Sequence, residues 1–399
     1  MQRIKWDNIL KFGILALYVS SVGYYMQVSI GSTLLWWLVF LMISIAMFML
    51  WDKTYHPAQL MIWMILVCAS SVAGCFFCRD YWDWKLLINN VISYSICLTA
   101  LGGEVPNVFQ KVLHFMYKHI WKLFLVLVFF VSSTGAAKLL IPYSFLALFY
   151  PLLSPKYKQV VLCALILIIV LGLASRIAIL RFLFCLLAGL FLVRYDFHKL
   201  IERCYWIFFI LPFALLVFAA KETFNIFEIG NNYTETEESI QELDLTDTRT
   251  LLYEEVISTV LERNTVYFGG TPARGYNSQW GTVSQDQSDA MGDMHYGERS
   301  MSECSVLNVF LHFGIVGLFV YMLLFWKASY LAIFKANNRY LQVIGFYVAF
   351  TFMLGWIGDN TRYDLNMFLI WVVLGMCYSP HYREMTDEEF RDWFAGVIE

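Results

Sequence analysis

Long apolar runs alternate with short polar segments along most of this chain. A helix needs about 20 predominantly apolar residues to cross a hydrocarbon core of about 30 Å. Backbone groups in lipid must be satisfied within their own segment, and the alternation of a membrane barrel is absent, so we expect helices. The pattern predicts about twelve transmembrane helices, near 12–30, 33–51, 59–78, 84–102, 120–137, 141–153, 159–174, 177–193, 204–219, 305–326, 340–358 and 363–378.

Two apolar stretches depart from a simple span. The stretch 141–153 (IPYSFLALFYPLL) is short and has proline near both ends, so a re-entrant segment is the alternative to a full span. The run 159–193 would be about 52 Å long as one helix at ~1.5 Å per residue. It must therefore break, near Ser175 and Arg176, which puts Arg181 about one turn into the second helix.

One long polar segment interrupts the apolar pattern. Residues 220–304 number 85 and hold 16 of the 31 acidic residues against five basic ones, a net charge of −11. Within it, Thr246 to Glu262 has apolar residues on one side and predicts an amphipathic helix, followed by a turn-rich break at 269–275. We predict an all-α membrane protein with nine spans in 1–219, a large extracytoplasmic loop at 220–304, three spans in 305–378 and a cytoplasmic tail at 379–399.

Composition and charge agree with a membrane protein. Hydrophobic residues make up 59% and charged residues 15%, where a soluble domain has about 25% charged residues. The net charge of −3 gives no basic surface for nucleic acid. With the N-terminus inside, 17 of the 28 Lys and Arg residues fall in predicted cytoplasmic segments, so both termini are expected in the cytoplasm.

Arginine dominates the basic residues on the predicted outer side. Topology needs only positive charge, whereas the planar guanidinium is preferred where a phosphate or carboxylate is held by two hydrogen bonds. The bias suggests an anion site, although small counts leave chance as an alternative, and Arg176 could instead only reach the lipid headgroups. The candidate anion-binding residues are Arg176, Arg181, Arg249, Arg274, Arg299 and Arg362.

Few side chains are available as an acid or a base. Glu303 stands where the chain returns to the membrane, although it could simply complement a helix dipole, and His295 lies in the loop, where it could be merely solvated. Asn308 and His312 share a helix face, which more often contacts neighbouring helices than a substrate. Metal-ligand and nucleotide-binding spacings are missing, so we expect neither a metal nor a cofactor.

Three stretches resemble the O-antigen polymerase and O-antigen ligase superfamily. LGLASRIAIL at 171–180 is similar to the family's Ser-Arg-small motif at the end of a span. The stretch 247–277 looks like its Arg-plus-amphipathic-helix followed by a Gly-rich turn, and 302–325 resembles its re-entry helix. Many ligase-like members carry His-Asn where this chain has Glu303 and Cys304, so the resemblance favours a polymerase-like member.

The resemblance implies a membrane glycosyltransferase. It would polymerise polyprenyl-pyrophosphate-linked oligosaccharide repeat units on the outer face of the bacterial inner membrane. Arg176 and Arg249 would then bind pyrophosphate, and Glu303 would occupy the place of the catalytic or substrate-orienting group. Implied partners are the lipid-linked oligosaccharide, membrane lipid, and flippase and chain-length regulator proteins of the same pathway. A ligase that transfers the glycan to another acceptor and a transporter or flippase for lipid-linked oligosaccharide are the alternatives.

Overall fold

The computed structural model describes residues 6–25, 30–51, 57–103, 105–171, 176–192, 198–221, 249–278, 294–295 and 297–398, and these are almost entirely helical. The longer helices are α1 Trp6–Tyr25, α2 Ile30–Leu50, α3 Ala58–Cys75, α4 Tyr81–Ser95, α6 Pro106–Leu127, α9 Pro155–Leu171, α10 Arg176–Leu192, α12 Ile207–Ala220, α13 Arg249–Glu262, α16 Ser305–Phe334, α17 Arg339–Leu354, α18 Leu365–Tyr378 and α20 Asp387–Ile398. Shorter elements are η1 Ile96–Thr99, α5 Ala100–Gly103, η2 Val128–Phe130, α7 Ser133–Leu140, α8 Tyr143–Ala147, η3 Tyr150–Leu152, α11 His198–Cys204 and α19 Pro380–Glu384. The strands β1 Tyr276–Asn277, β2 Met294–His295 and β3 Glu298–Arg299 form a small antiparallel sheet.

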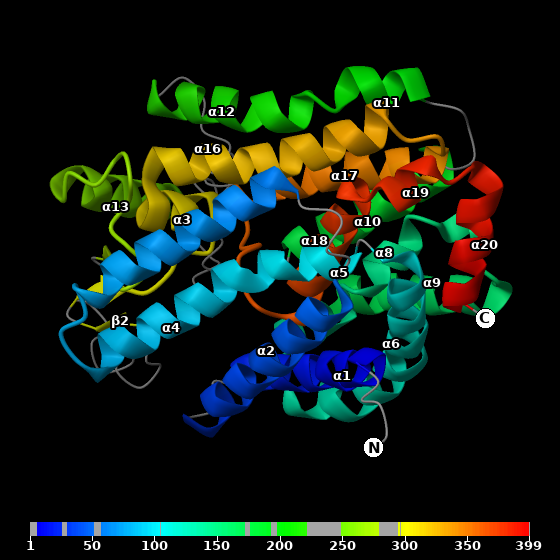
Figure 1. Ribbon diagram of the computed structural model, residues 1–399, viewed down its shortest axis with the longest axis horizontal. Coiled ribbons are helices and arrows are strands. Elements are labelled where there is room, and N and C mark those ends of the chain that lie inside the picture. Colours follow the sequence, from blue (N-terminus) through cyan, green and yellow to red (C-terminus); the bar gives the residue numbers. More distant parts are fainter. Residues whose placement is uncertain are drawn as a thin grey trace, which may run out of the picture.

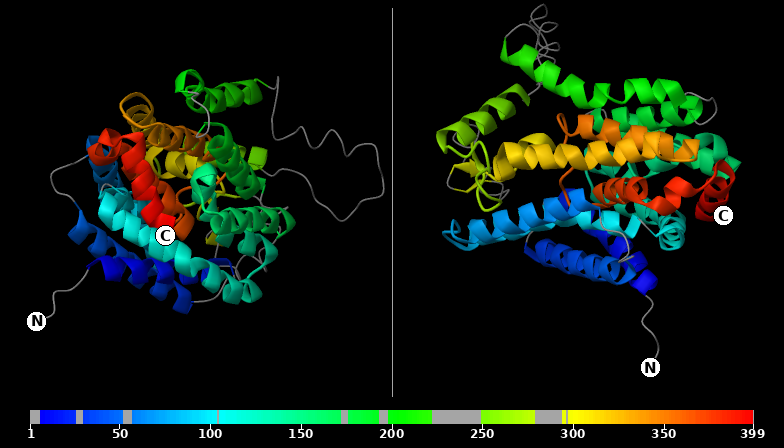
Figure 2. Two further views of the ribbon diagram at one scale, coloured as in Figure 1. Left: turned by 90° about the vertical axis from the view of Figure 1, so that its right-hand side faces the viewer. Right: turned by 45° about the horizontal axis from the view of Figure 1, so that its top comes forward.

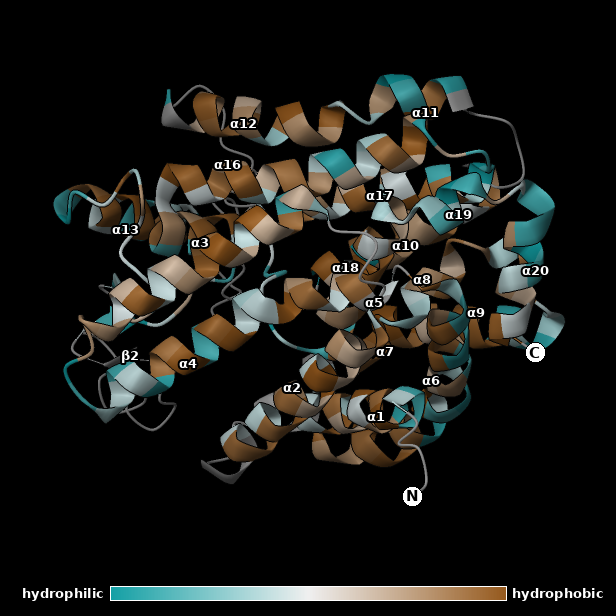
Figure 3. Ribbon diagram, viewed as in Figure 1, coloured by the Kyte–Doolittle hydropathy of each residue, from teal (hydrophilic) through white to brown (hydrophobic). Residues whose placement is uncertain are grey.

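Five helices among the described residues are long and apolar enough to cross a membrane, as expected of a multi-pass membrane protein. They carry exposed apolar side chains such as Leu38, Ile65 and Phe319, and Figure 3 shows apolar residues along most of the ribbon. In a soluble protein this surface would be unfavourable, whereas in lipid it costs nothing. The five segments are Thr33–Leu50, Ala58–Cys75, Pro106–Phe130, Lys199–Ala219 and Ser305–Phe334, so the predicted count of twelve is not confirmed.

The loop helix and the chain ends lie toward opposite ends of the molecule. Figure 1 shows α13 and β2 at one end, and α20 with the start of α1 toward the other. We call these the loop end and the termini end. The sequence assigned residues 379–399 only to a tail, but their described part contains α19 and α20. Trp393 of α20 donates through Nε1 to the Pro106 carbonyl of α6 at 3.0 Å.

The predicted spans 120–137 and 141–153 do not form two continuous helices. The first is replaced by α6, which starts at Pro106 and lies across the termini end, seen nearly in full length on the left of Figure 2. One side of α6 is buried, and Lys111, Lys118 and Lys122 are exposed, so this helix is amphipathic although Pro106–Phe130 is also long and apolar enough to cross a membrane. The second stretch is divided into α8 and η3, because its prolines interrupt helical hydrogen bonding.

The helix α16 is broken at Gly314, whose φ of 63° and ψ of −162° are not helical. The α16–α17 turn joins Phe334 to Arg339, and the Val306 amide of α16 donates to the Gly355 carbonyl, just beyond the end of α17, at 3.1 Å. If α16 were straight, its first residues would extend beyond the end of α17 by about 12 residues, or about 18 Å. The half of α16 that precedes Gly314 must therefore fold across the loop end of the bundle.

Candidate functional site

We infer that the polar segment between α17 and α18 lies within the depth of the membrane, because both flanking helices are apolar and too short to cross it. With 16 and 14 residues, these helices are only about 24 Å and about 21 Å long, shorter than a hydrocarbon core of about 30 Å. We call residues 355–364 the recessed loop. Non-helical backbone at this depth is tolerated only where protein buries it or where it lines a water-filled cavity.

A buried guanidinium meets the recessed loop from α10. Arg181 is only 3% exposed, and its Nη2 donates to Oδ1 of Asn360 at 2.8 Å. Its Nε has no hydrogen-bond partner, and no carboxylate of the described residues lies within ion-pair distance of the side chain. Asp364 acts on it only electrostatically at longer range. Arg181 is thus a buried cation with unused hydrogen-bond donors.

The recessed loop holds Asn360 in place through the start of α16. The Ser305 hydroxyl donates to the Gly358 carbonyl at 3.0 Å and accepts from the Asn360 amide, while Asn360 Nδ2 donates to the Thr351 carbonyl at 3.0 Å. The Ser305 amide also donates to Gly358. These hydrogen bonds fix Asn360 with its Oδ1 toward Arg181. They also satisfy the first amides of α16, so this helix start does not offer free amides to an anion.

Further charged groups surround the same place. Arg362 Nε donates to Asp359 Oδ2 at 2.5 Å, and Thr361 donates through its amide to Asp359 Oδ1 at 2.8 Å. Lys138 in α7 interacts electrostatically with Arg362 and with the carboxylates of Asp364, Glu303 and Asp359. Lys138 and Arg362 thus share an electrostatic environment with three carboxylates, those of Glu303, Asp359 and Asp364.

The loop helix α13 covers this cluster. Tyr253 Oη donates to the Trp356 carbonyl of the recessed loop at 2.7 Å, and Arg249, at the first turn of α13, interacts electrostatically with Tyr253. Arg299 Nη2 lies 3.9 Å from Glu303 Oε1, and Glu303 is exposed. Four predicted residues thus gather near the recessed loop: Arg181, Arg249, Glu303 and Arg362.

The remaining predicted residues lie elsewhere or are less defined. Arg176 is the exposed first residue of α10. The backbone of His295 in β2 pairs with Glu298 in β3, and the structure does not describe its side chain. The first part of the predicted amphipathic helix, residues 246–248, lies outside the described residues, and α13 begins at Arg249.

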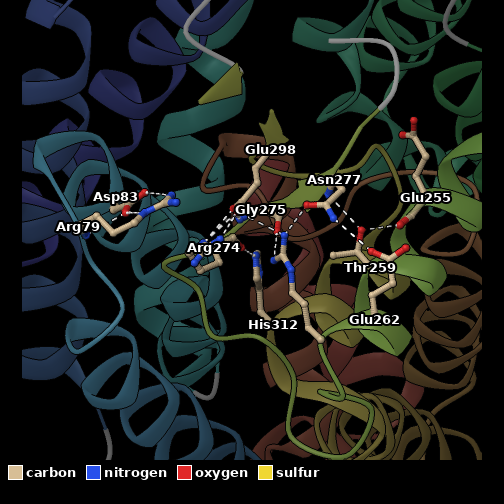
Figure 4. A network of polar contacts seen from close by, with 11 residues as sticks. Arg79, Asp83, Glu255, Thr259, Glu262, Arg274, Gly275, Asn277, Glu298 and His312 are labelled. Atoms are coloured by element: carbon tan, nitrogen blue, oxygen red, sulfur yellow. Dashed lines mark hydrogen bonds and ion pairs between the residues drawn. The ribbon is translucent and has the colours of Figure 1, made fainter. Parts of the chain in front are cut away.

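Arg274 belongs to a second polar network, shown in Figure 4. Its Nε donates to both Glu298 carboxylate oxygens at 3.0 and 3.1 Å, and the Gly275 amide donates to Glu298 Oε2 at 3.1 Å. Arg263 lies 3.3 Å from the same carboxylate. Since Glu298 is engaged by two cations and one amide, this network stabilises the fold of the loop and leaves Arg274 neutralised.

His312 is a packing residue of the broken helix. It is fully buried, with Nδ1 2.6 Å from the Tyr94 hydroxyl and Nε2 3.1 Å from the Arg274 carbonyl. A carbonyl can only accept, so Nε2 carries the proton that it donates to Arg274, while the Tyr94 hydroxyl also donates to the Asn308 carbonyl at 3.1 Å. The prediction that this polar face contacts neighbouring segments rather than substrate agrees with these contacts.

Sequence reasoning missed Lys138 and Asn360. Lys138 stands between two predicted spans, and only the broken path of 128–152 brings it to the recessed loop. Asn360 belongs to the polar sequence GDNTRYD, where the charged neighbours drew attention instead. No alternation or spacing marks either residue, and only a prediction of which spans are too short would have found them.

An apolar groove lies beside the recessed loop. The α12–α16 groove has a volume of about 710 Å³. It is lined by residues of these two helices and by Trp206, which precedes α12: Trp206, Phe209, Ile210, Phe213, Ala214, Val217, Phe218, Met322, Leu323 and Trp326. The Phe213 ring packs against Trp356 with centroids 4.7 Å apart, so the groove wall touches the recessed loop.

The comparisons with known proteins leave the family open. No family model, curated protein or solved structure matches this chain. Among the residues that the structure describes, no group of three or more His, Cys, Asp or Glu side chains could hold a metal ion. The function must therefore be argued from the charged cluster at the recessed loop and from the groove beside it.

Proposed function

We propose that this protein is a membrane glycosyltransferase that polymerises polyprenyl-pyrophosphate-linked oligosaccharide repeat units. The observation that carries the proposal is Arg181, a buried guanidinium without an ion-pair partner among the described residues. An uncompensated buried charge costs several kcal/mol, so a protein keeps one where a ligand supplies the opposite charge. A pyrophosphate supplies it and presents several acceptor oxygens to the unused donors.

Nearby cations suit an anionic leaving group. Transfer of a glycan from a lipid pyrophosphate breaks the bond between the sugar and the pyrophosphate, which leaves as an anion. Arg181 can stabilise that charge directly, and Arg362, although paired with Asp359, and Lys138 add positive charge to the same environment. The acceptor hydroxyl must be oriented and must lose its proton, which a carboxylate such as Glu303 can accept.

The apolar groove supports a lipid-linked substrate. A substrate whose pyrophosphate lies at the recessed loop needs space for its hydrocarbon chain within the membrane. The α12–α16 groove is apolar throughout and meets Trp356 of the recessed loop through Phe213. In this proposal the protein lies in the bacterial inner membrane with both termini in the cytoplasm, and it works with flippase and chain-length regulator proteins.

The test is polymerisation by the purified protein in nanodiscs. Short lipid-pyrophosphate repeat units are supplied, and the products are sized on a gel. We expect a ladder from the wild type and from Arg391→Met, a matched control on α20 at the termini end, and no ladder from Arg181→Met. A wild type that never extends the substrate contradicts the proposal. Transfer to a non-identical acceptor alone would identify a ligase, and translocation without a change in length would identify a transporter.

A further inference from the structure

A turn in the acidic loop exposes two aromatic side chains. Residues 265–270 connect α13 to the turn-rich segment, and Tyr267 and Phe268 at its tip are 70% and 72% exposed. Such exposure is unfavourable in water, because burying one aromatic side chain stabilises by about 1.5–3 kcal/mol. Something must cover this tip, which we call the aromatic turn.

The backbone of the aromatic turn is built into the break of α16. The amides of Ile315 and Val316 donate to the carbonyls of Val266 and Tyr267 at 2.8 and 3.2 Å, and the Gly270 amide donates to the Leu311 carbonyl at 2.7 Å. These are groups that the interrupted helix cannot pair internally. The turn is therefore fixed to α16 and cannot move away from it independently.

Its starting point is equally defined. Asn264, with a φ of 54°, ends α13, while the Thr265 amide donates to Val260 at 3.0 Å and the Asn264 amide donates to Leu261 at 3.1 Å. This is the Schellman arrangement that stops a helix and reverses the chain. It directs the chain after α13 toward the α16 break.

The length of α16 gives the level of the aromatic turn. From Ile315 to Phe334 the helix has 20 residues, or about 30 Å, which matches the thickness of a hydrocarbon core. Ile315 therefore lies at the boundary of the core on the loop side. The side chains of Ile315 and Phe319 are 51% and 57% exposed, so the lipid-facing surface of α16 continues into the aromatic turn.

We propose that the aromatic turn inserts into the bilayer leaflet on the loop side and anchors α13 at the membrane surface. Phe268 enters the hydrocarbon boundary, and Tyr267 lies at the headgroup level, where its ring is apolar and its hydroxyl remains hydrated. The net charge of −11 on the loop excludes electrostatic attraction to anionic lipid as the cause. This inference does not depend on the proposed glycosyltransferase activity.

The test measures the depth of a nitroxide label in liposomes. The accessible cysteines Cys68, Cys75, Cys78, Cys163 and Cys204 are first replaced by alanine. Labels are then placed by Phe268→Cys, by Phe319→Cys on the lipid-facing side of α16, and by Ser258→Cys on the exposed side of α13. Power saturation compares collisions with oxygen, which concentrates in lipid, and with a water-soluble nickel complex.

The two reference labels decide the outcome. We expect the oxygen-to-nickel ratio at 268 to be several-fold above that at 258 and closer to that at 319. A ratio closer to that at 258 overturns the proposal. If Phe268→Cys does not fold, Tyr267→Cys is measured instead. Its ratio is expected to lie between those at 258 and 319, as befits the headgroup level, and a ratio no higher than that at 258 overturns the proposal.

Discussion

At the scale of one residue, replacing Arg181 should affect the stability of the protein and its glycan transfer in different ways. Arg181→Met removes a buried charge that has no ion pair among the described residues, so the stability of the unliganded protein should fall by less than about 1 kcal/mol, or rise. Loss of one such donor to a transition-state anion should lower the rate of glycan transfer by about 10²–10³-fold. Gel-sized products and thermal unfolding of the same preparation measure both effects. A variant that unfolds much earlier than the wild type would mean that Arg181 is structural.

Glu298 should show the reverse behaviour. Glu298→Gln keeps the size of the side chain but leaves Arg274 and Arg263 without their shared counter-charge. We expect a loss of about 1–3 kcal/mol, seen as a lower unfolding temperature. Lipid-pyrophosphate binding by the protein that stays folded should be unchanged. An unaltered unfolding temperature would contradict the structural role of this network.

The candidate role of a residue could be predicted from the sequence where it follows from the energetic cost of placing a charge in an apolar segment. A charge inside an apolar run is expensive, and that reasoning singled out Arg176 and Arg181 as candidate anion-binding residues. The structure leaves Arg176 exposed at the start of α10 and buries Arg181, whose Nε has no hydrogen-bond partner. Arg274 is also an arginine on the predicted outer side, but its guanidinium is paired with the Glu298 carboxylate. A separation of 24 residues in the sequence does not predict such a pair. Pairing across a loop depends on the folded path of the backbone.

At the scale of elements, two glycines should be required where the aromatic turn meets α16. A Cβ added to Gly314 would lie 2.4 Å from the Tyr267 carbonyl carbon, and one added to Gly269 would lie 2.3 Å from His312. Gly314→Ala should therefore cost more than the about 1–3 kcal/mol typical of backbone strain alone. Gly297→Ala is the matched control, because its φ is also positive but nothing lies within 4 Å. Equal unfolding temperatures for both variants would contradict this.

Helix positions were predicted better than helix continuity. Hydrophobic length correctly indicated helices within most of the predicted spans, and the break in 159–193 is consistent with a helix that starts at Arg176. The prediction that 120–137 and 141–153 each form one continuous helix was wrong. Apolar composition does not distinguish a spanning helix from a buried chain that prolines interrupt. The pairing of α16 with a turn 41 to 49 residues earlier depends on tertiary hydrogen bonds that composition does not encode.

At the scale of the whole molecule, the groove and the recessed loop should act together. Ala214→Trp fills the α12–α16 groove, and we expect the KM for a long-chain lipid-pyrophosphate substrate to rise roughly tenfold. A substrate with a very short lipid chain should keep its KM, because it does not need the groove. Ala69→Trp, an exposed position on α3, is the matched control. Equal effects on both substrates would mean that the groove holds no substrate chain.

The depth of Arg181 has a consequence for the medium in which the protein works. Mobile ions weaken interactions between exposed charges over about 8 Å at physiological ionic strength, but they do not enter a site that is 3% exposed. Attraction between Arg181 and an anionic headgroup should thus vary little when sodium chloride is added. Any attraction between acidic lipid and the exposed lysines of α6, by contrast, should weaken as the salt concentration rises. The salt concentration would then weaken one electrostatic interaction of this protein and leave the other nearly unchanged.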